Sequence, residues 1–139
     1  MQPLKQNLVI ADGQVAATAT QITTGAASRA RRLNVIFSNV GTQTETLIIT
    51  TLRGGGANLT GTARRIHRVL LDPNWSLHIR GLPLNIDDSL LAVTTDAGAV
   101  DYVISMASEE TELEIRVYDD NGLPAASPQI FEQLAAVLG

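Results

Sequence analysis

The feature that most constrains this sequence is the alternation of apolar and polar residues in short segments. Its clearest case is residues 99–106, AVDYVISM, where Val100, Tyr102, Ile104 and Met106 form one of the two alternating sets. A period of two places one set on each face of a β-strand. The segment is therefore predicted to be an edge or surface-sheet strand with one buried face, and not a strand of a buried parallel sheet.

A second strand is predicted directly before this one. Residues 89–95 are rich in Leu, Val and Thr, which favour pleated strands, and Asp96-Ala97-Gly98 separates them from 99–106. Two strands joined by a short turn-forming segment are typical of a β-hairpin. The stretch 81–106 is accordingly predicted to be a loop followed by a hairpin.

Similar patterns predict strands along most of the chain. They lie at 8–10, 14–24, 33–39, 44–53, 63–71, 74–80 and 111–118. The strands 33–39 and 44–53 are predicted to form a hairpin, and the glycine-rich residues 54–61 a hairpin tip or strand connection. Trp75 falls on the apolar side of its strand and is predicted to anchor the core.

These segments define the predicted fold class, an all-β antiparallel β-sandwich of jelly-roll or Ig-like type with about eight strands. Residues 1–13 are predicted to form an extended N-terminal arm whose short strand ends at the turn signal Asp12-Gly13, residues 14–120 the sandwich, and residues 121–139 a linker and a short C-terminal α-helix. Ser127 is suited to cap that helix and Pro128 to occupy its first position. Ile130, Phe131 and Leu134 lie on its apolar stripe.

Composition excludes several classes of protein. The chain has no cysteine, which removes disulfide scaffolds, cysteine zinc sites and thiol nucleophiles. Its N-terminus lacks the pattern of a signal peptide, and no apolar run is long enough to cross a bilayer, so no membrane role is expected. No catalytic motif is present, so we expect a protein that is not an enzyme and that needs no cofactor.

Three candidate constellations are weaker than their structural alternatives. His67 and His78 are predicted in strands separated by a turn and could be cross-strand neighbours, but nearby arginines oppose a metal cation. Asp87-Asp88 and the run 119–122, DDNG, carry oxygen ligands without the full spacing of a calcium loop, so turn chemistry is the preferred interpretation.

Charge is distributed unevenly along the chain. Residues 1–80 contain nine basic and three acidic residues, whereas residues 81–139 contain one basic and eleven acidic residues. Specific nucleic-acid binding is not expected, because the chain is acidic overall and lacks exposed aromatics among its arginines. The arginines are better suited to an acidic protein surface. The predicted protein-contact residues are Leu8, Val9, Ile10, Arg29, Arg31, Arg32, Arg64, Arg65, Ile130, Phe131 and Leu134.

About half of the chain, residues 32–107, resembles the small β-sandwich virion proteins of tailed bacteriophages. The pattern consists of a strand ending in Ser38-Asn39, a threonine-rich partner strand, and a glycine-leucine segment followed by two strands. In that last part the matching residues are Gly81, Leu82, Leu84, Asp88, Ser89, Leu90, Ala92, Thr94, Ala97, Ala99, Val100, Tyr102, Val103 and Ser105. It is a pattern of strands and turns and contains no catalytic residue.

The resemblance implies a head decoration or cement protein made in the host cytoplasm and located on the capsid surface of the virion. Its implied partner is the major capsid protein, and it implies a homo-oligomer, for which we favour a trimer over a dimer. A tail, connector or fibre-base subunit is the alternative within the virion. A carbohydrate-binding sandwich that uses Trp75 or Tyr102 as a stacking platform is the alternative from another class.

Overall fold

The computed structural model describes residues 9–18, 20–23, 30–53, 62–108 and 110–124, with the backbone alone for 62–66. These residues form strands and contain no helix. The nine strands are β1 (Val9–Gln14), β2 (Thr20–Gln21), β3 (Arg31–Asn39), β4 (Glu45–Arg53), β5 (Thr62–Leu71), β6 (Ser76–Leu84), β7 (Ser89–Thr94), β8 (Val100–Ala107) and β9 (Glu114–Tyr118).

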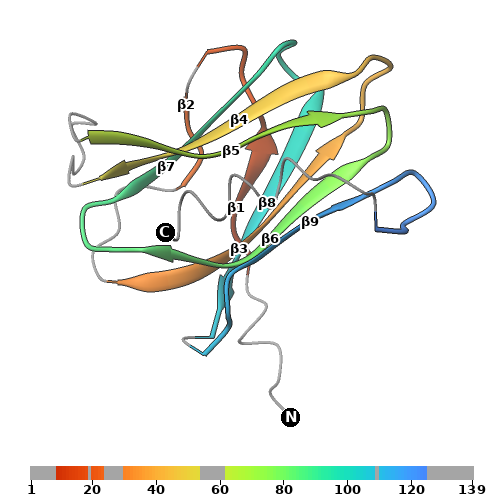
Figure 1. The fold of residues 1–139 in the computed structure, drawn as a ribbon. Coiled ribbons are helices and arrows are strands. Elements are labelled where there is room, and N and C mark those ends of the chain that lie inside the picture. Colours follow the sequence, from red (N-terminus) through yellow and green to blue (C-terminus); the bar gives the residue numbers. More distant parts are fainter. Residues whose placement is uncertain (1–8, 19, 24–29, 54–61, 109, 125–139) are drawn as a thin grey trace.

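The strands form two antiparallel sheets that pack face to face as a β-sandwich (Figure 1). One sheet has the order β1-β8-β3-β6-β9, and the other has the order β2-β7-β4-β5. The first four strands pair with the next four in reverse order, namely β1 with β8, β2 with β7, β3 with β6 and β4 with β5. The predicted antiparallel sandwich is confirmed.

Two of the predicted hairpins are wrong. β7 and β8 lie in different sheets, and so do β3 and β4. The connection 95–99 therefore crosses from one sheet to the other, and both strands still turn their apolar faces to the same core. β8 is an internal strand between β1 and β3, so the edge-strand alternative is wrong, whereas a strand of a surface sheet with one buried face agrees with the structure. The glycine-rich segment does join a true hairpin, because β4 and β5 pair antiparallel along their lengths.

The predicted inward faces are confirmed. Leu33, Val35 and Phe37 of β3 are fully buried, and Leu47 and Ile49 of β4 meet them from the opposite sheet in one core. Ile115 and Val117 of β9 and Ile104 of β8 join that core, while Tyr102 and Met106 pack against it half-buried. Trp75 precedes β6 and packs against the same core, as the sequence predicts.

The alternation in β6 shifts by one residue at Gly81. Leu77 and Ile79 are buried before it, and Leu82 and Leu84 after it, so the inward set changes parity. Gly81 has a φ of 68°, a left-handed conformation that glycine adopts without steric cost. The register between β3 and β6 slips at the same place, between Leu33 and Val35. This β-bulge lets one strand keep both halves of its apolar sequence in the core.

Both ends of the chain extend beyond the described residues. From Val9 the predicted arm is an edge strand paired with β8, and the turn predicted at Asp12-Gly13 is wrong because both residues lie inside β1. Residues 1–8 lie outside the described part. So does the predicted C-terminal helix with Ile130, Phe131 and Leu134, which stays a prediction.

Candidate interaction surfaces

Several of the predicted contact residues gather at one end of the sandwich. All odd-numbered strands begin at this end and all even-numbered strands end there, because every connection reverses the chain direction. Arg31 and Arg32 begin β3, Arg53 ends β4, and the backbone of Arg64 and Arg65 pairs with Thr51 and Thr50 beside it. We call this the arginine end; it lies toward the left of Figure 1.

Two of these arginines are held by the fold. The Arg32 Nη1 donates to the Gly81 carbonyl at 2.9 Å and so supports the bulge. The Arg53 Nη1 lies 2.8 Å from the Asp88 Oδ2, and the Asp88 side chain is only 3% exposed whereas that of Arg53 is 41% exposed. Arg53 can therefore neutralise a buried carboxylate and still present part of its guanidinium to solvent.

The remaining predicted contact residues fall into two groups. Val9 begins β1 at the arginine end and is 51% exposed, whereas Ile10 packs half-buried against the core. Leu8 and Arg29 lie outside the described residues, as do the side chains of Arg64 and Arg65. The structure thus brings Val9, Arg31 and Arg32 to one end, while Ile10 contributes to packing.

Sequence reasoning missed one apolar residue at this end. Ile86 lies in the connection between β6 and β7 and is 58% exposed. A turn fixes its position. The Asp88 backbone N donates to the Asn85 carbonyl O at 3.1 Å across this turn, and Asp87 within it adopts a φ of 68°. Asp87 and Asp88 therefore form part of this turn, in agreement with the turn interpretation of the sequence. The sequence signal that could have identified Ile86 is its position as a large apolar residue among the polar residues Asn85, Asp87 and Asp88.

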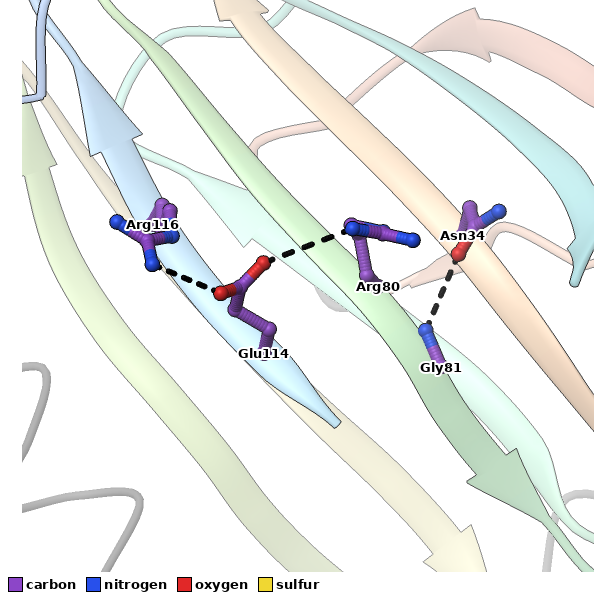
Figure 2. A network of polar contacts seen from close by, with 5 residues as sticks. All are labelled: Asn34, Arg80, Gly81, Glu114 and Arg116. Atoms are coloured by element: carbon purple, nitrogen blue, oxygen red, sulfur yellow. Dashed lines mark hydrogen bonds and ion pairs between the residues drawn. The ribbon is translucent and has the colours of Figure 1, made fainter. Parts of the chain in front are cut away.

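An acidic depression adjoins the arginine end beside β9. It has a volume of about 400 Å³, and its lining residues are Arg80, Glu110, Thr111, Glu112, Leu113 and Glu114. Figure 2 shows the Glu114 carboxylate between two arginines, 2.9 Å from the Arg116 Nη2 and 3.8 Å from the Arg80 Nη1. The hydrogen bond from Arg116 lowers the pKa of Glu114. The paired charges lie on the outer face of the five-stranded sheet.

The two histidines are not cross-strand neighbours, which removes the two-histidine metal site that the sequence left open. His67 lies on β5 and points into the core, whereas His78 lies on β6 in the other sheet and shares the outer face with Arg116. Burial lowers the pKa of His67 to about 4. Within the described part of the chain, no group of three His, Cys, Asp or Glu side chains could hold a metal ion.

Two carboxyl groups meet at the opposite end of the sandwich. The buried Glu45 Oε1 accepts from the Thr94 hydroxyl at 2.9 Å and from the Asp96 backbone N at 2.8 Å. Burial raises the pKa of Glu45, but the hydrogen bonds from Asp96 and Thr94 outweigh it, so the net shift is downward. The hydrogen bond and negative charge of Glu45 raise the pKa of Asp96. This arrangement ties the start of β4 to the connection after β7.

The fold and these surfaces define an all-β, two-sheet antiparallel sandwich. Comparison with protein-family models, with curated proteins and with solved structures gave no match. No helix among the described residues is long and apolar enough to cross a membrane.

Proposed function

We propose that this protein is a non-enzymatic virion structural protein that binds the outer capsid surface and stabilises the shell by bridging coat subunits. The observation that carries the proposal is the reversed pairing of strands, β1 with β8, β2 with β7, β3 with β6 and β4 with β5. This order supports a sandwich of jelly-roll rather than Ig-like type. Jelly rolls are recurrent in viral capsid proteins, and also in lectins.

The resemblance of residues 32–107 to phage virion proteins supports the first of these two uses. A lectin role would require Trp75 or Tyr102 as a stacking platform, but both pack against the core. Fold alone does not establish function, so a capsid-binding role also requires a suitable surface. The arginine end is that surface in our proposal.

The arginine end is suited to an acidic face of the major capsid protein. It combines arginine residues from three strands with the exposed apolar Val9 and Ile86. Guanidinium groups bind carboxylates with two parallel hydrogen bonds and so fix orientation. Contacts that this protein buries across the boundary between two coat subunits would have to break before the shell opens. An oligomer would strengthen such binding, because its linked sites raise the effective concentration for each further contact.

The test is co-sedimentation of the purified protein with empty shells of the same virus. We expect saturable binding that the double substitution Arg64→Glu and Arg65→Glu weakens at least about tenfold, because the two reversals change the charge of this end by four units. Arg68→Glu is the matched control: Arg68 is an exposed arginine of the same strand, farther from this end. Binding no stronger than to an unrelated surface would refute the proposal.

Copy number separates decoration from the alternative of a tail, connector or fibre-base subunit. Quantitative mass spectrometry of purified particles should find this chain at a stoichiometry comparable to that of the coat subunits. A complement as small as a single connector ring would instead favour the alternative.

A further inference from the structure

The outer face of the five-stranded sheet carries one row of side chains that runs across all five strands. Cross-strand register places Asp12 of β1 opposite Val103 of β8, Val103 opposite Ile36 of β3, Ile36 opposite His78 of β6, and His78 opposite Arg116 of β9. Directly paired residues share a face, and Ile36 lies between the fully buried Val35 and Phe37. The whole row therefore points outward.

The centre of this row is apolar and exposed. Ile36 and Val103 are neighbours on adjacent strands, and each is 39% exposed. His78 flanks Ile36 on the other side and packs against the Tyr118 ring with a centroid distance of 4.6 Å. Two neighbouring apolar side chains in the middle of a sheet face, bordered by polar residues, are suited to a protein contact.

Across the row that contains Ile36 and the row that contains Ser38 together, the charges at the two edges of the sheet have opposite signs. The β1–β8 side carries the carboxylates of Asp12 and Asp101. In these rows the β6–β9 side carries Arg116, which is bonded to Glu114. Arg80 and Glu114 lie in the next row toward the arginine end (Figure 2), where Glu110 and Glu112 line the acidic depression. Since β3 is the middle strand of the five, the acidic and basic sides lie at equal strand separations from Ile36.

We propose that this face pairs with the same face of a second copy of the chain, about a two-fold axis that runs parallel to β3. Such an axis exchanges the two edges of the sheet, so each side meets its opposite. Ile36 then contacts Ile36 of the partner subunit, and Asp12 meets Arg116 of the partner subunit. Val103 packs on His78 of the partner subunit, which completes a self-complementary contact.

The neighbouring row fits the same operation. It consists of Gln14, Asp101, Ser38, Ser76 and Tyr118, placed opposite one another by the same registers. The two-fold axis brings the Asp101 carboxylate to Ser76 of the partner subunit, whose hydroxyl can donate to it. Sheets packed face to face are rotated by about 30°, and the length of the arginine side chain spans the resulting offset at the edges.

The size of the face sets the expected affinity. The face is roughly 24 Å wide across its five strands, which are about 4.8 Å apart, and roughly 17 Å long if about five residues of each strand take part. With the relief of its side chains, this is on the order of 1,000 Å² buried over both copies, at the lower limit of specific interfaces. The dimer should therefore dissociate in the micromolar range and weaken as salt screens the edge charges.

The dimer has a consequence for the arginine end. An axis parallel to the strands leaves the strand direction unchanged, so both arginine ends point the same way. A dimer then presents two equivalent surfaces to one partner, as bridging requires. The pairing itself does not depend on the proposed function, because it rests on the sheet face alone. It also differs from the trimer that the resemblance favours.

The test uses two charge reversals on the full chain, Asp12→Lys and Arg116→Glu, measured by sedimentation velocity across a micromolar concentration series. Each variant alone carries two like-charge contacts in its dimer, so we expect its dissociation constant to rise at least about tenfold. Mixed one to one, the variants form a heterodimer in which both contacts are again opposite in charge. The mixture should therefore recover the dimer.

This rescue distinguishes an intermolecular contact from an effect on the fold. Asp12 and Arg116 of one copy are four strand spacings apart, about 19 Å, and cannot pair with each other. Circular dichroism checks that each variant is folded. Ile36→Ser should also weaken the dimer, whereas Leu70→Ser, at a 51% exposed position on the other sheet, should not. A monomeric wild type, a trimer, or a mixture that stays monomeric would overturn the proposal.

Discussion

Replacement of Gly81 by alanine is the most direct test of the bulge that aligns β6. A Cβ at this position would lie 2.6 Å from the Thr111 carbonyl O and 2.7 Å from the Glu112 carbonyl O. Both atoms belong to backbone and cannot rotate away. The left-handed φ of 68° costs a non-glycine residue about 1 kcal/mol, and displacement of a packed segment costs about 2 kcal/mol more. The free energy of unfolding should fall by about 3 kcal/mol.

The matched control is Gly122→Ala. Gly122 has a similar φ of 78°, but a Cβ there would meet no atom within 4 Å. Gly122→Ala should lower the free energy of unfolding only by the cost of the left-handed backbone conformation, about 1 kcal/mol. Alanine also reduces the entropy of the unfolded chain, but this effect is common to both variants. Urea unfolding followed by Trp75 fluorescence gives both values. Equal losses in the two variants would refute the claim that the backbone at 111–112 blocks a side chain at Gly81.

Three further predictions concern buried polar groups. His67 has a folded pKa of about 4 against 6.5 unfolded, so the unfolded state binds a proton first as pH falls. The free energy of unfolding should drop between pH 6.5 and 4 by up to about 3 kcal/mol, and His67→Leu should flatten that dependence in urea titrations across pH. Asn39→Ala should cost about 2 kcal/mol in thermal or urea unfolding, because the Leu71 carbonyl loses its 2.8 Å side-chain donor. Glu45→Gln should lower the pKa of Asp96 toward its ordinary value in an NMR titration, since the charge of Glu45 helps to raise it.

Two of these predictions have clear contrary outcomes. A wild-type stability that stays flat from pH 6.5 to 4 would mean that His67 is not buried in its neutral form. An unchanged Asp96 titration in the Glu45 variant would mean that the two carboxyl groups do not interact.

The candidate contact residues show which parts of a site a sequence can indicate. Uneven charge and arginine clusters pointed to residues 29–32 and 64–65, and the structure places the described members of both segments at one end. The sequence did not indicate that Arg32 is held by Gly81 or that Arg53 neutralises Asp88, since these partners are 49 and 35 residues away along the chain. Long-range ion pairs and hydrogen bonds depend on register, which no local pattern encodes.

The sequence alone determined most of the strands and the faces they bury, because period-two alternation is a property of each strand by itself. Its predicted strand at 14–24 is wrong, since Gln14 ends β1 and, of the other described residues there, only Thr20–Gln21 form a strand. The sequence could not determine which sheet a strand joins. β7 and β8, or β3 and β4, bury the same faces whether their connection makes a hairpin or crosses to the opposite sheet, since both sheets share one core. Only the tertiary structure decided the reversed pairing, the parity shift at Gly81, and the charge row on the outer face that follows from the pairing.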